Sequence, residues 1–167
     1  MDVEIRRART PDVPAIAELL RAYSGAGQLL QKATVTLFED LQEFRVAERV
    51  DDGRIVGCGA LHVMWDDLAE VRSVAVHPDL KGRGVGGRLV STLLDTARWI
   101  GVRRVFVLTF ETAFFGRFGF REIDGAPVDH AVWEELLRSY DEGVAEFLDL
   151  ERVKPNTLGN TRMLLHL

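Results

Sequence analysis

The feature that most constrains the fold is a glycine-rich segment, Lys81–Gly87 (KGRGVGG). It follows a strand-like run, Glu70–Val76 (EVRSVAV), which Pro78 ends. Apolar residues then recur at helical spacing until Gly101, which is typical of an amphipathic helix with a glycine stop. The next apolar run, Val105–Thr109 (VFVLT), completes a strand–helix–strand order. A helical crossover of this length predicts that the two strands are parallel.

The surrounding segments predict an antiparallel half. Three strand-like segments, Glu43–Arg49, Ile55–Val63 and Glu70–Val76, precede the glycine-rich segment and have short connections. The turn Asp51-Asp52-Gly53 joins the first two, and this arrangement is typical of an antiparallel meander. The predicted strands are Val3–Ala8, Glu43–Arg49, Ile55–Val63, Glu70–Val76, Val105–Thr109, Phe120–Ile123 and Arg162–Leu167. The predicted helices are one capped by Thr10 or Asp12, then Val35–Leu41, Gly86–Ile100, Thr112–Phe118 and one capped by Asp129. Ser24–Gln31 is a predicted mobile loop, and the whole pattern indicates an α/β or α+β domain.

Composition restricts the class of protein. The chain has 167 residues, of which 47% are hydrophobic, enough for the core of one domain over residues 1–167. We expect the aromatic residues Trp99, Trp133, Tyr140 and Phe147, at helical spacings, to be core. The 21 Lys and Arg against 26 Asp and Glu give a net charge of −5, so neither nucleic acid nor an anionic membrane is expected as a partner.

Cysteine count and the amino terminus add two exclusions. Cys58 is the single cysteine, which excludes an internal disulfide and a zinc cluster, and no metal site is expected. The charged start MDVEIRRART is unlike a signal peptide, and no run approaches the ~18 apolar residues of a membrane span. We therefore expect a soluble, cytoplasmic protein.

The glycine segment has the chemistry of an anion-binding loop. Glycines before a helix let backbone N–H groups point into one concavity, where the helix dipole favours an anion. Gly84 and Gly86 would let the main chain approach a pyrophosphate closely. Lys81, Arg83 and Arg88 add positive charge in an acidic protein. The alternative is a glycine-rich surface turn with scattered basic residues.

Two other nucleotide motifs fit less well. The Walker A pattern fails because Gly-Lys-Ser/Thr is missing at the required spacing. The dinucleotide fingerprint is present as Gly82-x-Gly84-x-x-Gly87, with Glu111 further along. However, five residues from His77 separate these glycines from the strand, whereas the fingerprint begins at the end of a strand that opens a parallel unit.

The segment Glu70–Gly87 (EVRSVAVHPDLKGRGVGG) resembles motif A of the GNAT acetyltransferases, in which Gln/Arg-x-x-Gly-x-Gly/Ala follows a strand. Lys81 stands in the Gln/Arg place and keeps a donor there. The segment Phe115–Phe120 resembles the next family motif, which closes in Gly-Phe. The resemblance implies the GNAT fold over almost the whole chain: a mixed, mostly antiparallel sheet of about seven strands flanked by helices, with a parallel central pair.

Within this family, the chain is similar to the acetyltransferase domain of bacterial N-acetylglutamate synthases, and more closely to the short stand-alone form of actinobacterial arginine biosynthesis. The matching segments are VRSVAVHP, RVFVLTFET, GVAEFLDL and VKPNTLGNTRMLL. The resemblance implies acetyl transfer from acetyl-CoA to the α-amine of L-glutamate. The family's habit is a homodimer. Longer relatives carry an arginine-binding kinase-like domain, and feedback control through that domain is not carried over.

The resemblance also implies which residues hold the cofactor. The family holds pantetheine as a pseudo-strand against the main chain of Val74, Ala75 and Val76, where a backbone N–H polarises the thioester carbonyl. The pyrophosphate would rest on the loop residues Lys81, Gly82, Arg83, Gly84, Val85, Gly86 and Gly87. The amine then attacks directly, by proximity and proton removal. Cys58 is accordingly interpreted as a small apolar strand residue and not as a nucleophile.

An attacking amine must be neutral, so a general base is useful. Glu70, eleven residues before Lys81, matches the glutamate used in the histone-modifying branch of the family. The alternative for Glu70 is an exposed strand-end carboxylate or an ion pair with Arg72. His62 and His77 are weaker candidates.

The general acid of the family is missing at its usual place. Many members have a tyrosine four residues before the Gly-Phe glycine, and here that position is Phe115. Because the CoA thiol resembles that of cysteine, with a pKa of about 8.5, a specific acid matters little. Tyr23 and Tyr140 are alternatives that the sequence does not place at the site.

A dicarboxylate acceptor needs cations and hydrogen-bond donors. We expect these from Lys32, after the predicted loop, from Arg72, on the same strand face as Glu70, and from the carboxyl-terminal group. That group is Asn160, Thr161 and Arg162, of which the arginine fork suits a carboxylate. The alternative for each of the three cations, Lys32, Arg72 and Arg162, is a solvated charge on the protein surface.

Three functional hypotheses stay open at this point. The first is acetylation of L-glutamate. The second is another acceptor amine, such as glutamine, a different amino acid, a polyamine or a protein N-terminus. The third is a module that binds acetyl-CoA without turnover. Turnover separates the third hypothesis from the others, and an acceptor panel separates the first two.

Overall fold

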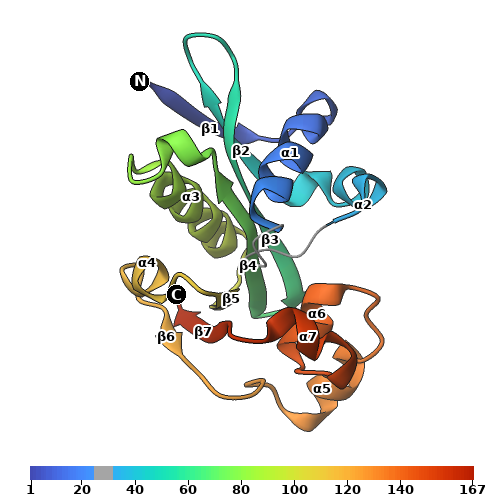
Figure 1. The fold of residues 1–167 in the computed structure, drawn as a ribbon. Helices are drawn as coiled ribbons and strands as arrows, with labels where there is room; N and C mark the ends of the chain where they lie inside the picture. The colour runs from blue at the N-terminus through green and yellow to red at the C-terminus, as the bar shows by residue number, and fades with distance from the viewer. Residues whose placement is uncertain (25–31) are drawn as a thin grey trace. The chain divides into compact units, whose positions relative to one another are not determined.

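The computed structural model describes residues 1–24 and 32–167, and Figure 1 shows their elements. The described strands form one seven-stranded sheet in the order β1-β2-β3-β4-β5-β7-β6. They are β1 (Val3–Arg7), β2 (Phe44–Arg49), β3 (Ile55–Trp65), β4 (Leu68–Val76), β5 (Arg104–Thr109), β6 (Arg121–Glu122) and β7 (Thr161–His166). The helices are α1 (Val13–Ser24), α2 (Thr34–Glu39), α3 (Val85–Ile100), α4 (Thr112–Gly116), α5 (His130–Leu136), α6 (Glu142–Phe147) and α7 (Lys154–Thr157). Short 3-10 turns are η1 (Thr10–Asp12), η2 (Leu41–Glu43), η3 (Pro78–Leu80) and η4 (Glu151–Val153).

The residues group into two compact units. Unit 1 comprises Met1–His62 and Val71–Thr96, and unit 2 comprises Val63–Glu70 and Ala97–Leu167. The single domain over residues 1–167 stays a prediction. The fold class is confirmed, because the sheet has seven strands and its β4–β5 pair is parallel.

Unit 1 is built on the antiparallel strands β1, β2 and β3, in which Ile5 lies opposite Ala47 and Val46 opposite Cys58. Helices α1 and α2 cover one face of these strands, and α3 lies on the other (Figure 1). Alternation along β2 explains the two faces, since Val46 belongs to the core under α1 and Ala47 to the core under α3. The predicted apolar face of α1 is buried: Val13, Ile16, Leu19 and Leu20.

Two glycines in β3 let α3 approach the sheet closely. A Cβ on Gly57 would lie 3.0 Å from a Leu89 methyl carbon, and one on Gly59 would lie 3.1 Å from a Leu93 methyl carbon. Most real Cβ atoms lie farther than this from a neighbour, so a larger residue would require the two leucine side chains to shift by a few tenths of an ångström. The glycines therefore leave room for Leu89 and Leu93 of α3 to pack directly on β3.

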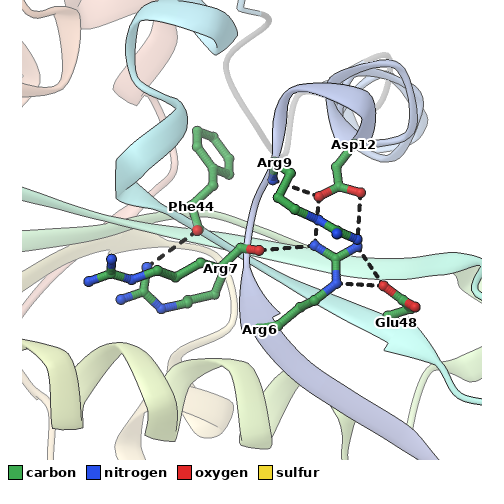
Figure 2. A network of polar contacts seen from close by, with 7 residues as sticks. Arg6, Arg7, Arg9, Asp12, Phe44 and Glu48 are labelled. Carbon is green, nitrogen blue, oxygen red and sulfur yellow. Dashed lines mark hydrogen bonds and ion pairs between the residues drawn. The ribbon is translucent and has the colours of Figure 1, made fainter.

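An ion-pair network joins η1, the turn immediately before α1, to the β1–β2 ribbon (Figure 2). The Arg6 guanidinium donates to both carboxylate oxygens of Asp12, at 2.8 and 3.0 Å, and also contacts Glu48. Asp12 accepts a further bond from the Arg9 backbone N–H at 2.7 Å. The hydrogen bond from Arg6, opposed by burial and helped by Arg9, holds the pKa of Asp12 below its usual range.

Replacing Asp12 with alanine should lower the free energy of unfolding by about 2–3 kcal/mol at neutral pH, because it leaves Arg6 without its main partner in a partly buried place. The folded-state pKa of Asp12 is lowered, so its contribution is full above the unfolded pKa of about 3.9. It is lost as pH falls through the folded-state pKa. Urea unfolding at several pH values measures both effects.

A matched control is Glu142→Ala, which breaks the exposed pair between Arg152 and Glu142 at 2.7 Å. Exposed pairs contribute about 0–1 kcal/mol, so the control should be nearly neutral. An Asp12→Ala variant as stable as the Glu142→Ala variant would show that the network of Figure 2 adds nothing to stability.

Unit 2 holds the parallel pair predicted from the sequence. Its portion of β4 pairs with β5 at Leu68–Glu70, and Glu70 lies opposite Phe106. β7 runs antiparallel to β5 along its whole length and also pairs with β6. The core of this unit is centred on Phe106 and Phe147, whose ring centroids are 5.0 Å apart at an interplanar angle of 81°.

Several sequence predictions need correction. Neither Thr10 nor Asp12 is the N-cap, because both belong to η1, whose N-cap residue is Arg9, and the Asp12 carboxylate binds Arg9 and Arg6. Trp99 is 83% exposed and Tyr140 fully exposed, so neither is core, whereas Phe147 is buried and Trp133 partly buried. The helices α6 and α7 were not predicted. The predicted mobile loop begins at Ser24, which ends α1, and its remaining residues, 25–31, lie outside the described residues.

Candidate functional site

The glycine loop has the backbone that its sequence predicts. Gly82 and Gly84 have φ values of +78° and +83°, in the left-handed region that favours glycine. Apart from the glycine itself and its two chain neighbours, no heavy atom of the described residues lies within 4 Å of a Cβ built on either one. Conformation therefore selects glycine here, and the space beside the loop is open. Because α3 begins at Val85, the N–H groups of its first turn lack intrahelical acceptors.

The charge of this loop is positive. Lys81 and Arg83 flank Gly82, and Arg88 follows in the first turn of α3. A helix amino terminus with open space, left-handed glycines and cationic neighbours fits a phosphate or pyrophosphate. The turn η3 separates the glycines from β4, which is unlike the dinucleotide fingerprint and agrees with the rejection of that motif.

β4 is irregular just before Val74. Ser73 is buried and has a φ of +56°, a left-handed conformation that a regular strand does not contain and that residues other than glycine adopt rarely. Such a residue locally interrupts strand pairing and re-aims the backbone groups that follow. The Cys58 thiol donates to the Ser73 carbonyl at 3.4 Å. No sequence signal marks Ser73, which was therefore not predicted as part of the site.

Cys58 itself is inert. It is fully buried, and burial raises the pKa of its thiol to about 12. The thiolate required for a nucleophile is therefore not formed near neutral pH. This agrees with its interpretation as a small apolar strand residue.

The end of β4 receives a hydrogen bond from α1. The Tyr23 hydroxyl donates to the Val76 carbonyl. The next residue, His77, donates its N–H to Val56 of β3 at 2.8 Å, so strand alternation directs the Val76 carbonyl away from β3. Tyr23 therefore contacts β4, the strand that the family resemblance proposes for cofactor binding. Nothing in the sequence indicated this position of Tyr23.

In unit 2, Glu70 and Arg162 come together around Phe106. Glu70 is only 5% exposed, so the alternative of an exposed strand-end carboxylate is wrong. The Arg162 guanidinium lies 5.1 Å from the Phe106 ring centroid, and Phe106 is opposite Glu70 in the β4–β5 pair. Burial lowers the pKa of Arg162, while the charges of Asp149 and Glu70 act in the opposite direction.

Backbone carbonyls hold most of the Arg162 guanidinium. Nε and one N–H of Nη2 donate to Gly125 at 3.1 and 2.9 Å, Nη1 donates to Glu146 at 2.9 Å, and Nη2 also donates to Phe147. These bonds use four of the five guanidinium N–H donors. In this state Arg162 supplies fixed positive charge and one Nη1 N–H, so a bidentate carboxylate fork there requires some of these bonds to break.

Asn160 and Thr161 complete the carboxyl-terminal group. Asn160 donates its side-chain N–H to the Asn156 carbonyl at 3.4 Å, and Thr161 begins β7 opposite Thr109. Both side chains are partly exposed. The structure therefore brings three of the predicted acceptor residues to one strand start, in the same unit as Glu70.

In unit 1, Arg72 belongs to a second polar cluster. Its Nη2 lies 3.8 Å from Oε2 of Glu43, and Oε1 of Glu43 lies 2.6 Å from Nδ1 of His62. Lys32 pairs instead with Asp40, at 3.9 Å. Glu43 was not singled out from the sequence, because it precedes β2 and its two partners lie on β3 and β4.

The remaining candidates lie elsewhere. The ring of His77 binds locally, with Nδ1 accepting from the Asp79 N–H at 3.3 Å and Nε2 lying 3.3 Å from Arg54. Phe115 is buried against Phe114 and Phe120. Tyr140 is fully exposed, whereas Tyr23 contacts the end of β4.

Residues 13–120 match the acetyltransferase (GNAT) family, and the chain therefore belongs to that family. It is 60% identical to an amino-acid acetyltransferase of Mycobacterium tuberculosis over 162 residues, which cover 96% of this chain and 92% of that protein. The resemblance to a short stand-alone GNAT acetyltransferase is confirmed.

Two solved structures are similar over nearly all of this chain. The crystal structure of Rv2747 from Mycobacterium tuberculosis, in complex with CoA and NLQ, has a TM-score of 0.96 and 59% identity, and the match covers 98% of this chain and 99% of that one. N-acetylglutamate synthase of Neisseria gonorrhoeae, complexed with coenzyme A and N-acetyl-glutamate, has a TM-score of 0.78 and 27% identity. That match covers 100% of this chain and 35% of the synthase chain.

The described residues include neither a candidate membrane span nor a candidate metal cluster. None of the described helices is both long and apolar enough to cross a membrane. Across residues 1–24 and 32–167, no three His, Cys, Asp or Glu side chains are grouped as a metal ion would need.

Proposed function

We propose that the protein transfers the acetyl group of acetyl-CoA to the α-amine of L-glutamate, as the first step of arginine biosynthesis in the cytoplasm. The observation that carries the proposal is the open, left-handed glycine loop at the start of α3. It occurs in a chain that is 60% identical, over 96% of its length, to an amino-acid acetyltransferase. A homodimer is part of the proposal, and nucleic acid, membrane and metal have no role in it.

Acetyl-CoA supplies an acetyl thioester when bound. The loop N–H groups between Gly82 and Gly87, with Lys81 and Arg83, hold its pyrophosphate. The main chain of Val74–Val76 binds the pantetheine as a strand would, because the left-handed Ser73 re-aims the backbone that follows. A backbone N–H at this place stabilises the charge that develops on the carbonyl oxygen.

Glu70 removes the proton from the incoming amine. It is a buried carboxylate, 5% exposed, in the part of β4 that pairs with β5. Arg162, whose guanidinium feels the Glu70 charge, is the fixed cation of this region. Since the amine attacks directly, the chain needs no nucleophile of its own, and the buried Cys58 is consistent with that.

Lys32, Arg72, Asn160, Thr161 and Arg162 bind the acceptor amino acid in this proposal. The carboxylates of L-glutamate require positive charge, which Arg72 and Arg162 supply, and neutral donors, which Asn160 and Thr161 supply. The second candidate acceptor is L-glutamine. The Glu43 carboxylate beside Arg72 favours glutamine. It offsets the positive charge of Arg72, which the side-chain carboxylate of glutamate would need and the side-chain amide of glutamine would not.

The test is an acceptor panel. We expect kcat/KM with acetyl-CoA to be highest for L-glutamate, lower for L-glutamine and negligible for polyamines and peptide N-termini, when CoA thiol release is measured. A higher value for glutamine would reassign the acceptor but keep the reaction. Tight acetyl-CoA binding without release to any acceptor would favour the non-catalytic module.

A further inference from the structure

We propose that Glu43 is a specificity-determining residue of the acceptor site. By offsetting the charge of Arg72, it sets how strongly the site prefers an acceptor with a side-chain carboxylate over one with a side-chain amide. This inference rests on the proposed function, since it names what chooses between glutamate and glutamine.

Three separate segments converge on the Glu43 carboxylate. Glu43 ends η2 immediately before β2, His62 lies near the end of β3, and Arg72 lies in β4. The Glu43 Oε1 atom is 2.6 Å from His62 Nδ1, and the Oε2 atom is 3.8 Å from Arg72 Nη2. All three side chains are largely enclosed, with 24%, 19% and 9% of their surface exposed.

The two contacts of Glu43 differ in kind. The 2.6 Å contact with His62 is a hydrogen bond, which fixes the direction of the carboxylate. The 3.8 Å separation from Arg72 is longer than a hydrogen bond, so this pair is coupled by charge. Oε2 of Glu43 is buried and receives no hydrogen bond from any described residue. The second oxygen therefore acts on Arg72 through its field alone.

Because Glu43 acts on Arg72 by charge and not by a hydrogen bond, it changes the electrostatic potential at Arg72 without using an N–H donor of the guanidinium at that contact. With Glu43 ionised, the positive potential at Arg72 is reduced for any other anion nearby. The energy of a charge scales with the local potential. The lower potential therefore weakens binding of the glutamate side-chain carboxylate, and it has little effect on the neutral side-chain amide of glutamine. The α-amine and α-carboxylate are common to both acceptors and cancel in their ratio.

The experiment measures kcat/KM for L-glutamate and for L-glutamine, at one pH and at saturating acetyl-CoA, in three variants of the full chain. Glu43→Gln keeps the shape and an acceptor for His62 but removes the charge. We expect it to raise the glutamate-to-glutamine ratio by about ten-fold. Glu43→Asp, which keeps the charge, should leave the ratio within about two-fold of wild type. Glu142→Gln, which removes an exposed carboxylate paired with Arg152, should leave it unchanged.

A ratio that is unchanged or lower in Glu43→Gln would overturn the inference, whatever happens to the absolute rates, since loss of folded protein lowers both activities together. If Glu43→Gln does not fold, Arg72→Met tests the same claim with the opposite sign. Its ratio should fall by about ten-fold, and an unchanged ratio would overturn the inference. Wild-type protein that acetylates neither amino acid would overturn the proposed function itself, which is a distinct result.

Discussion

Replacing Glu70 with glutamine lowers kcat by about 10²- to 10⁴-fold, the usual contribution of a general base. Glu70 is a buried carboxylate in the part of β4 that pairs with β5, and its charge acts on Arg162. Glutamine keeps the size and removes the basic oxygen. Acetyl-CoA affinity should stay within about two-fold of wild type, because the proposed cofactor residues lie in the later part of β4 and in the loop. Stopped-flow thiol release gives kcat, and calorimetry gives the affinity.

The pH profile separates a lost base from a damaged fold. Without a base, the variant depends on amine that is already neutral, so its kcat rises with pH across the range where the wild type levels off. Glu122→Gln is the matched control, because Glu122 is an exposed glutamate on β6. Equal kcat for Glu70→Gln and the control would remove Glu70 as the base and return attention to His62.

Replacing Gly84 with valine weakens acetyl-CoA binding by about 10²-fold or more. The φ of Gly84 is +83°, where a β-branched residue is a genuine outlier, at a cost of about 1–3 kcal/mol. The space at its Cβ position is also open in the described structure, and the proposed pyrophosphate occupies that space. A side chain there excludes the phosphate as well as straining the loop.

Asparagine at position 84 distinguishes backbone strain from exclusion of the pyrophosphate. Asparagine tolerates the left-handed conformation, but its side chain still fills the space beside the loop. We expect Gly84→Asn to bind acetyl-CoA nearly as weakly as Gly84→Val. Gly101→Ala is the matched control, because Gly101 has a φ of +107° and open space at its Cβ position, but follows the far end of α3. It should lower stability and leave affinity unchanged. Normal affinity of Gly84→Asn would contradict the placement of the pyrophosphate.

The fold was predictable where its signals are local. Glycines before an amphipathic helix, Gly101 after it and the apolar Val105–Thr109 predicted the parallel pair, and β4 and β5 pair in this way. Hydrophobic spacing likewise predicted the buried face of α1. Asp129 was predicted to cap a helix and accepts the Val132 N–H at 3.0 Å. Each of these depends on residues within a few positions of one another.

The candidate site was less predictable because its contacts span the chain. Tyr23 meets Val76 and Glu43 meets Arg72 only after the sheet has formed. Ser73 takes a left-handed conformation with no glycine or asparagine to announce it. The family resemblance could select Arg162 as a cation but could not show that backbone carbonyls take most of its donors. Sequence motifs thus predicted the glycine loop before α3, whereas they could not predict the contacts of the proposed acceptor residues.

The proposed reaction is tested by CoA thiol release from acetyl-CoA with L-glutamate as the sole acceptor, against a blank without acceptor. The product is examined by mass spectrometry. The proposal predicts release well above the blank and glutamate heavier by one acetyl group in equal amount. Release no faster than the blank, by protein that binds acetyl-CoA, would contradict it.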